Sequence, residues 1–132
     1  MIANEPTRPR LPADFAFGNI AVDFDRGRLT RDGTAVPVPL KELQLLRYLV
    51  ARRGGVVTRE ELLREVWDYA AVTTRTVDVH VAGLRQKIEE HPRSPRFLLT
   101  VRGGGYMFRG DDMRIVRDAG DDYGAAASPR SS

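Results

Sequence analysis

The stretch from Thr74 to His91 carries residue types that could contact DNA. On a helical wheel, one side of it holds small, polar and cationic groups, with no acidic residue among them. These residues are Thr76, Val79, His80, Gly83, Gln86 and Lys87. In a major groove, short polar side chains can hydrogen-bond base edges, and an apolar side chain can contact a thymine methyl group. The alternative is an ordinary solvated helix face, so the surrounding sequence has to decide between the two.

The opposite side of the same stretch predicts a buried helix face. Val77, Val81, Leu84 and Ile88 recur at i, i+4, i+7 and i+11, which places them in one narrow apolar stripe. We therefore expect a helix over residues 74–91 that packs this stripe against a core.

Two shorter helices are expected before this one. The first covers residues 40–53 and ends at the glycine pair that follows. Its expected buried residues are Leu43, Leu46, Leu49 and Val50. The second begins at a capping box, in which the Thr58 hydroxyl and the Glu61 carboxylate each accept a backbone N–H, and it runs to about Trp67. Two helices, a loop over 68–73 and a third helix form the order of a helix-turn-helix motif with a lengthened turn.

Short strands are expected on both sides of the helices. Residues 15–24, 28–31 and 34–38 predict a small antiparallel sheet, with turn sequences between them. Residues 97–101 and 106–109 predict a hairpin with three consecutive glycines at its tip. No helix is expected after these glycines, so they are not a phosphate-binding loop; they can instead approach another backbone closely.

The chain is expected to hold one folded domain between two tails. Residues 1–13 contain three of the eight prolines and predict a linker or disordered N-terminus. Residues 14–110 form the domain. Residues 111–132 are acidic and then Ala/Ser-rich, which predicts a disordered C-terminal tail with at most a short turn around Met113 to Val116.

The charge of this 132-residue chain is unevenly distributed. The net charge is +3, but residues 73–110 contain seven Lys or Arg against three Asp or Glu. A basic region on a nearly neutral chain indicates a polyanionic partner. The absence of cysteine excludes disulfides and thiolate metal sites, and His80 and His91 do not make a zinc site. We expect no metal and no cofactor.

Membrane and enzyme functions are not expected. No apolar run approaches the ~20 residues of a membrane-spanning helix, and the Pro/Arg-rich start does not resemble a signal peptide. We therefore expect a soluble, cytoplasmic protein. No grouping of His, Asp and Ser converges on neighbouring loops, and most carboxylates fall on helix surfaces or in turns, so catalysis is not predicted.

Four segments together resemble the winged-helix effector domain of the OmpR/PhoB family of two-component response regulators. They are LKELQLLRYLV (40–50), VVTREELLREVW (56–67), RTVDVHVAGLRQKIEE (75–90) and LLTVRGGGYMF (98–108). The resemblance covers residues 15–109. It implies an α+β winged helix-turn-helix fold with an N-terminal four-stranded antiparallel sheet, three helices and a C-terminal β-hairpin wing.

The function that this resemblance implies is sequence-specific binding of double-stranded DNA in transcription regulation. The third helix, over 74–91, would enter the major groove, and the wing, over 97–109, would reach the adjacent minor groove. The receiver domain that normally precedes this domain is missing from the sequence. We therefore expect either an isolated effector fragment or a receiver-less regulator.

The resemblance also implies particular DNA-contacting residues. On the helix they are Arg75, Thr76, Val79, His80, Ala82, Gly83 and Arg85, and on the wing they are Thr100, Arg102 and Tyr106. Gln86 and Lys87 share the helix face, and Trp67 matches a position whose indole N–H can meet a phosphate, although we expect it mainly in the core. Ala82 and Gly83 stand where better-known members carry cations, so base reading is expected to rest on Val79, His80 and Gln86.

Several of these residues have a structural alternative. Arg85 could pair with Glu89 one turn along the helix instead of with a phosphate. Tyr106 could serve hairpin packing, and Thr76 could support the helix start. Arg102 could be a simple exposed cation, although insertion into a narrow A·T-rich minor groove is favoured.

The expected partners follow from the same resemblance. Two copies would associate on tandem direct half-sites about one helical turn apart, and the loop over 68–73 could contact RNA polymerase. The rival hypothesis is a winged-helix module that binds protein and has no specific DNA readout. Few large apolar groups lie on the expected groove face, which argues against the rival.

Overall fold

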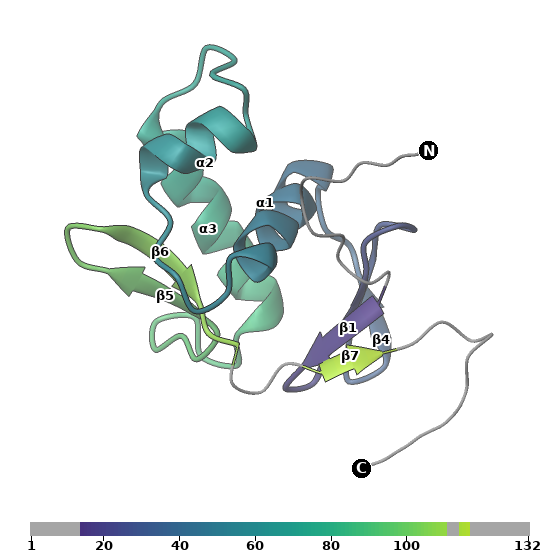
Figure 1. Ribbon diagram of the computed structural model, residues 1–132. Helices are drawn as coiled ribbons and strands as arrows, with labels where there is room; N and C mark the ends of the chain where they lie inside the picture. Colours follow the sequence, from purple (N-terminus) through teal and green to yellow (C-terminus); the bar gives the residue numbers. More distant parts are fainter. Residues whose placement is uncertain (1–13, 111–113, 117–132) are drawn as a thin grey trace, which may run out of the picture.

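The computed structural model describes residues 14–110 and 114–116. The strands are β1 (Asp14–Phe17), β2 (Ile20–Asp23), β3 (Arg28–Arg31), β4 (Thr34–Val36), β5 (Leu98–Val101), β6 (Gly105–Phe108) and β7 (Arg114–Val116), and the helices are α1 (Leu40–Ala51), α2 (Arg59–Glu65) and α3 (Thr74–Ile88). The hairpin β5–β6 projects on one side of the helices, and the N-terminal sheet lies on the other (Figure 1). The predicted winged-helix fold is confirmed.

The N-terminal sheet corrects the expectation of one continuous strand over residues 15–24. Gly18 adopts a φ of +54°, and the chain reverses there, so that Phe17 pairs with Ile20 across a tight turn. Glycine tolerates this left-handed conformation without a steric penalty, which is why the alternating pattern on either side of it belongs to two strands. The two strands complete the four-stranded antiparallel sheet that the resemblance implied.

A fifth strand extends this sheet and corrects the expectation for residues 113–116. The strand order is β4-β3-β2-β1-β7, with Asp14 opposite Val116 and Phe15 opposite Ile115. Without β7, strand β1 would leave one row of backbone groups unpaired at the sheet edge. The remainder of the predicted C-terminal tail, and the predicted N-terminal linker over 1–13, lie outside the described residues.

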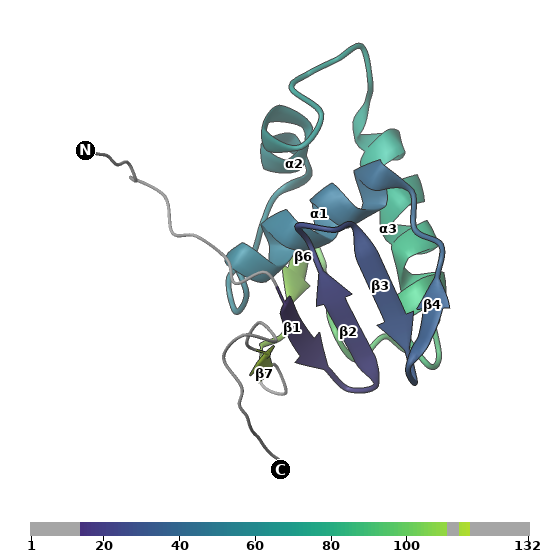
Figure 2. The ribbon, with the colours of Figure 1, turned by 90° about the vertical axis from the view of Figure 1, so that its right-hand side faces the viewer.

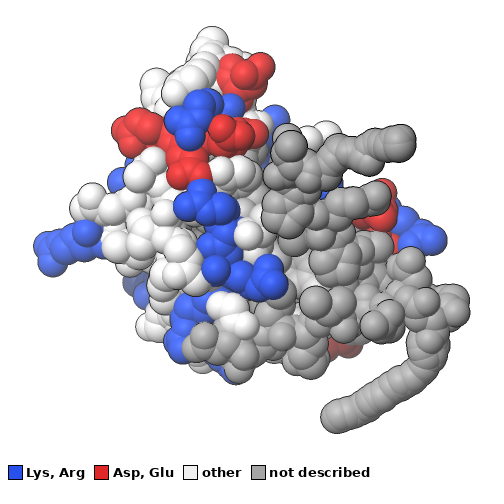
Figure 3. Space-filling view, in the orientation of Figure 1, with Lys and Arg blue, Asp and Glu red and all other residues white. Residues whose placement is uncertain are grey.

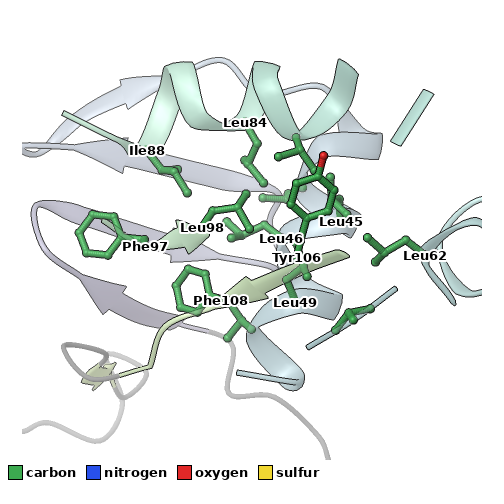
Figure 4. Close-up of a cluster of buried hydrophobic side chains, with 14 of the residues drawn as sticks. Leu45, Leu46, Leu49, Leu62, Leu84, Ile88, Phe97, Leu98, Tyr106 and Phe108 are labelled. Carbon is green, nitrogen blue, oxygen red and sulfur yellow. The ribbon is translucent and has the colours of Figure 1, made fainter. Parts of the chain in front are cut away.

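The core lies between the sheet and the helices. The sheet contributes the fully buried residues Phe15, Phe17, Ile20 and Leu29, which alternate with outward-facing positions. Figure 2 looks onto the outer face of the sheet, with α1 and α3 behind it. The predicted helix faces are confirmed, because the apolar stripes of α1 and α3 are buried. Figure 4 shows how the aromatic rings of Phe97, Tyr106 and Phe108 meet leucines from α1, α2 and α3.

The helix ends differ from the predictions by a few residues. Helix α1 stops at Ala51, α2 at Glu65 and α3 at Ile88, each two or three residues earlier than expected. At α2 the Thr58 hydroxyl accepts the Glu61 N–H at 3.0 Å, as predicted. The Glu61 carboxylate, however, accepts from the Tyr48 hydroxyl and from Arg52. The Glu61 side chain therefore links α2 to α1 instead of capping the start of α2.

Candidate nucleic-acid interface

One stripe of α3 remains exposed while the rest of the helix is packed. Arg75, Val79, Ala82 and Gln86 are exposed, and Val79 is 58% exposed. Their spacing of four, three and four residues confines them to an arc of about 60°. This arc lies opposite the buried stripe that contains Val81. The exposed stripe overlaps the predicted groove face but is narrower than it.

His80 lies beside the stripe and packs against Trp67. Its Nδ1 is 2.8 Å from the Thr76 carbonyl oxygen, and its ring meets the Trp67 ring edge-on at 5.0 Å between centroids. Because a carbonyl oxygen can only accept, Nδ1 carries the proton in this contact, and in the neutral ring Nε2 is an acceptor. Trp67 is 7% exposed and has Lys41 over its ring, so its predicted position in the core is confirmed.

Gly83 and Lys87 face α1. A Cβ atom at Gly83 would lie 2.4 Å from Glu42 Oε2, so a larger residue would have to displace this buried carboxylate. The Lys87 ammonium group is 2.8 Å from Glu42 Oε1 and donates to the Gly83 carbonyl at 3.2 Å. The ammonium pairs with Glu42 Oε1 electrostatically without being aligned for a hydrogen bond. Both residues were predicted on the groove face, and here they join α3 to α1.

Arg85 connects α3 to the wing. Its guanidinium donates twice to the Leu98 carbonyl, at 3.0 and 2.8 Å, and once to the Thr100 hydroxyl at 2.8 Å. It also lies over the Tyr106 ring, 5.6 Å from the centroid. Burial lowers the pKa of Arg85. The alternative of an ion pair with Glu89 is wrong as the main contact, because the hairpin engages the guanidinium.

A second set of contacts joins the wing, α3 and α2. The buried Tyr106 donates its hydroxyl to Asp78 Oδ1 at 2.6 Å, and Arg59 donates to the same oxygen at 2.6 Å. In Figure 4 the Tyr106 ring lies within the core with its hydroxyl directed toward α3. Burial opposes the charge of Asp78, but the bonds from Tyr106 and Arg59 outweigh it, so the pKa of Asp78 is lowered. Burial and the bond to Asp78 raise the pKa of Tyr106.

Two further residues hold the C-terminal end of α3. Glu89 is 1% exposed, and its carboxylate accepts the backbone N–H groups of Arg96, Phe97 and Leu98 at 2.6 to 3.0 Å. Arg31 in β3 donates to the carbonyl oxygens of Gln86, Lys87 and Glu89 at 3.4, 3.3 and 3.1 Å. These last carbonyls of a helix have no partner within the helix. The N-terminal sheet therefore fixes the end of α3.

The glycines of the wing divide into a packed base and an open tip. A Cβ atom at Gly105 would lie 2.1 Å from the Val57 carbonyl oxygen, where the hairpin meets the segment before α2. This is the close backbone approach that the sequence suggested. At Gly103, in contrast, a Cβ atom would meet no described atom within 4 Å. Arg102 is exposed beside it and makes no hydrogen bond or ion pair with another described residue. On the face drawn in Figure 3, a basic group projects at the wing tip and acidic groups gather over α2.

The predicted site residues therefore fall into two groups. Arg75, Val79, Gln86 and Arg102 are exposed, with Thr76 and His80 half-buried beside them. The second group is engaged within the domain and consists of Trp67, Gly83, Arg85, Lys87, Thr100 and Tyr106. Thr100 belongs to it through its hydroxyl, which accepts from Arg85, although the residue itself is exposed. The contacts by which five other residues fix α3 or the wing were not predicted. These residues are Arg31, Glu42, Arg59, Asp78 and Glu89, and each meets its partner only after the chain has folded.

The described residues lack the features of two other kinds of site. Within residues 14–110 and 114–116, no group of three or more His, Cys, Asp or Glu side chains could hold a metal ion. No helix in the same residues is long and apolar enough to cross a membrane.

Comparison with known proteins identifies the family. Residues 33–108 match the family described as "Transcriptional regulatory protein, C terminal". The sensory transduction protein RegX3 of Mycolicibacterium smegmatis is 45% identical over 95 residues, which are 70% of this chain and 41% of RegX3. The crystal structure of DrrB, an OmpR/PhoB homologue from Thermotoga maritima, has a TM-score of 0.69 at 36% identity and covers 74% of this chain and 45% of DrrB.

A third relative was solved as an isolated domain on DNA. The DNA-binding domain of Klebsiella pneumoniae RstA, in complex with the RstA box, has a TM-score of 0.64 at 26% identity and covers 73% of this chain and 96% of that domain. The match spans less than half the length of curated relatives such as RegX3. The family is one of transcriptional regulators and not of enzymes. The chain belongs to the C-terminal domains of transcriptional regulatory proteins of the OmpR/PhoB type.

Proposed function

We propose that this domain binds double-stranded promoter DNA, with α3 in the major groove and the β5–β6 wing in the adjacent minor groove. The observation that carries the proposal is the single exposed stripe of α3, on a helix whose other sides are packed, beside a wing with an exposed Arg102. A major groove about 12 Å wide admits a helix of this diameter. The RstA domain, similar in fold, was crystallised with its DNA box.

The proposed roles follow from exposure. Arg75 supplies charge to a phosphate, and Arg102 enters the minor groove. Thr76, Val79, Gln86 and the free Nε2 of His80 face bases. Arg85 and Lys87 act by fixing α3 to the wing and to α1, since their charged groups already have partners inside the domain.

The rival function, docking to a protein through α3, has less support. The exposed large apolar side chains among the described residues are Leu40, Val56, Tyr69 and Val79, which come from four different segments. Val79 is the only one of these four residues that lies in α3. Apolar docking would depend weakly on salt, whereas a DNA complex releases counterions and weakens steeply as salt rises.

The test is selection from a pool of random duplexes at two salt concentrations, followed by sequencing of the retained DNA. We expect one enriched sequence and an affinity that falls steeply with salt. Salt-sensitive binding without an enriched sequence would remove base reading from the proposal. Binding at neither salt concentration would favour the protein-docking function.

The wing is tested with Arg102→Ala on the selected site with either A·T-rich or G·C-rich flanks. We expect a larger loss of affinity on A·T-rich flanks, because a narrow minor groove has the more negative potential. Arg28→Ala is the matched control, since Arg28 is an exposed arginine in β3, away from α3 and the wing. Equal losses for Arg102→Ala on both flanks would contradict the minor-groove role.

Two finer proposals concern the protein partners of the domain on DNA, and the first is a second copy of the chain. We propose that two copies associate on tandem direct repeats about one helical turn apart. The selected sequence would then contain a direct repeat, and shifting one half-site by five base pairs would abolish joint binding. A single unrepeated half-site bound by one copy would contradict this arrangement.

The loop over 68–73 is proposed to contact RNA polymerase. Asp68, Tyr69 and Ala71 have φ values of +53°, +54° and +54°, and Tyr69 is 58% exposed. Non-glycine residues in this conformation are uncommon. We expect Tyr69→Ala to lower transcription from the selected site in a purified polymerase assay while DNA affinity is unchanged. Unchanged transcription would remove this role.

A further inference from the structure

Internal contacts reduce the set of α3 side chains that can reach bases. Lys87 and Gly83 are engaged with Glu42, and Arg85 is engaged with the wing. His80 uses one ring nitrogen on the Thr76 carbonyl, and its ring packs edge-on against Trp67. Most of the polar and cationic groups along both flanks of α3 thus hold the helix in place, and only Thr76 and Nε2 of His80 remain beside the exposed stripe.

The stripe that remains has an unusual chemistry for a base-reading surface. Its two central members, Val79 and Ala82, end in methyl groups, and both are exposed. Methyl groups neither donate nor accept hydrogen bonds. In the major groove, the base feature that matches them is the C5-methyl group of thymine, because the other groove positions are donors and acceptors. Polar base edges placed under these side chains would lose water without gaining a partner.

The spacing along the helix suits neighbouring base pairs. Val79 and Ala82 are separated by an axial rise of about 4.5 Å, and successive base pairs are about 3.4 Å apart. Gln86 follows one turn later and can donate and accept on an adenine edge. Arg75 lies one turn before Val79 and suits a phosphate.

We propose that α3 recognises its site through thymine C5-methyl groups, with Val79 and Ala82 in apolar contact with thymines on neighbouring base pairs. This inference rests on the proposed function and specifies what the major-groove helix recognises. It predicts that the centre of each half-site is read mainly by shape and apolar contact. Charge then supplies affinity from the ends of the stripe and from the wing.

Deoxyuridine provides the test, because it lacks only the C5-methyl group and keeps every hydrogen-bonding atom of thymine. Each thymine of the selected site is replaced singly by deoxyuridine, and the dissociation constant of the full 132-residue chain is measured by fluorescence anisotropy. We expect a loss of about fourfold at each of two neighbouring positions and about 15-fold for both together, from the usual contribution of one buried methyl group. Thymines under the wing serve as internal controls, since their methyl groups point into the major groove.

A variant locates Val79 on the site. Val79→Ala is expected to weaken binding to the thymine duplex about fourfold. In this variant, replacing the thymine that contacts Val79 by deoxyuridine should then cause no further loss of affinity. Leu40→Ala is the matched control, because Leu40 is a 69% exposed apolar residue at the start of α1. Leu40→Ala should keep the full response to deoxyuridine. An equal response to deoxyuridine in the wild type and in Val79→Ala would assign the methyl contact to another residue and overturn the role of Val79.

The outcomes separate this inference from the proposed function. An enriched site that binds equally well with thymine and with deoxyuridine, or that has no thymine in its centre, overturns methyl recognition and leaves DNA binding intact. Loss of specific DNA binding altogether overturns both. Because the central comparison uses wild-type protein on two duplexes, no folding defect can mimic its result.

Discussion

The flanks of α3 and its exposed stripe use similar side chains in different ways. On the flanks, Arg85 and Asp78 have partners within the domain, and these contacts join α3 to the wing and α2. On the stripe, Arg75 and Gln86 are exposed. A polar side chain on this helix is therefore not evidence of a DNA contact by itself. The flanks orient the helix and the wing, and the stripe is left to contact a partner.

This comparison predicts that changes to residues with partners inside the domain reduce stability, whereas changes to residues on the exposed stripe reduce binding only. The largest effect on stability is expected at the base of the wing. In Gly105→Ala, the new Cβ would lie 2.1 Å from the Val57 carbonyl oxygen at a φ of +125°, and backbone atoms cannot move aside cheaply. We expect a loss of more than about 3 kcal/mol in the free energy of unfolding, measured by urea denaturation.

Gly103→Ala is the control for that variant. It has a φ of +74°, but its Cβ would meet no described atom within 4 Å. Only the backbone conformation is penalised there, so we expect a loss of about 1 to 2 kcal/mol. Equal losses at the two positions would mean that the wing base is not held against the segment before α2.

Glu89→Ala should have the next largest effect. It removes the acceptor of three backbone N–H groups at the start of the hairpin, from a position that is 1% exposed. We expect a loss of about 2 to 3 kcal/mol in unfolding free energy, because buried donors are left without partners. The neighbouring Glu90 is exposed, and Glu90→Ala should change stability by less than about 0.5 kcal/mol. A mild effect at Glu89 would show that water replaces the carboxylate.

Tyr106→Phe should have a smaller, pH-dependent effect. It removes the hydroxyl that donates to Asp78, whose side chain is 42% exposed, so solvent screening limits the loss to about 1 kcal/mol at neutral pH. The pKa of Asp78 is lowered in the folded state. Its stabilisation is therefore present above the ordinary value of 3.8 and is lost as the pH falls through the lowered pKa. Unfolding free energies at several pH values should show the two proteins converging in acid.

The smallest effect on stability is expected on the exposed stripe of α3. Arg75→Ala should change the unfolding free energy by less than about 0.5 kcal/mol, because Arg75 is exposed and bonds to no other described residue. If Arg75 contacts one phosphate, the slope of log affinity against log salt should decrease by about 0.9. A clear loss of stability without a change in slope would show that Arg75 has a partner inside the domain and does not contact a phosphate.

Much of this architecture could be predicted because it depends on local rules. The 3.6-residue periodicity identifies α3 and its buried stripe, and the Thr58 cap marks the start of α2. The glycine run predicts a turn, and the three segments before the first helix predict a sheet. The division of residues 15–24 was missed because an alternating apolar pattern is the same on both sides of a turn, and Gly18 alone marks the reversal.

The sequence by itself therefore determined the helices, their buried faces, the wing and, through the resemblance, the family. Only the tertiary structure decided which side chains of α3 are free. Arg59 and Tyr106 lie 19 and 28 residues from Asp78 in the chain, and Glu42 meets Gly83 from another helix. Periodicity describes one element at a time, so it cannot show which polar residue finds its partner on the neighbouring element. Strand β7 could not be predicted for the same reason, because it pairs with an edge of β1 that exists only after the sheet has assembled.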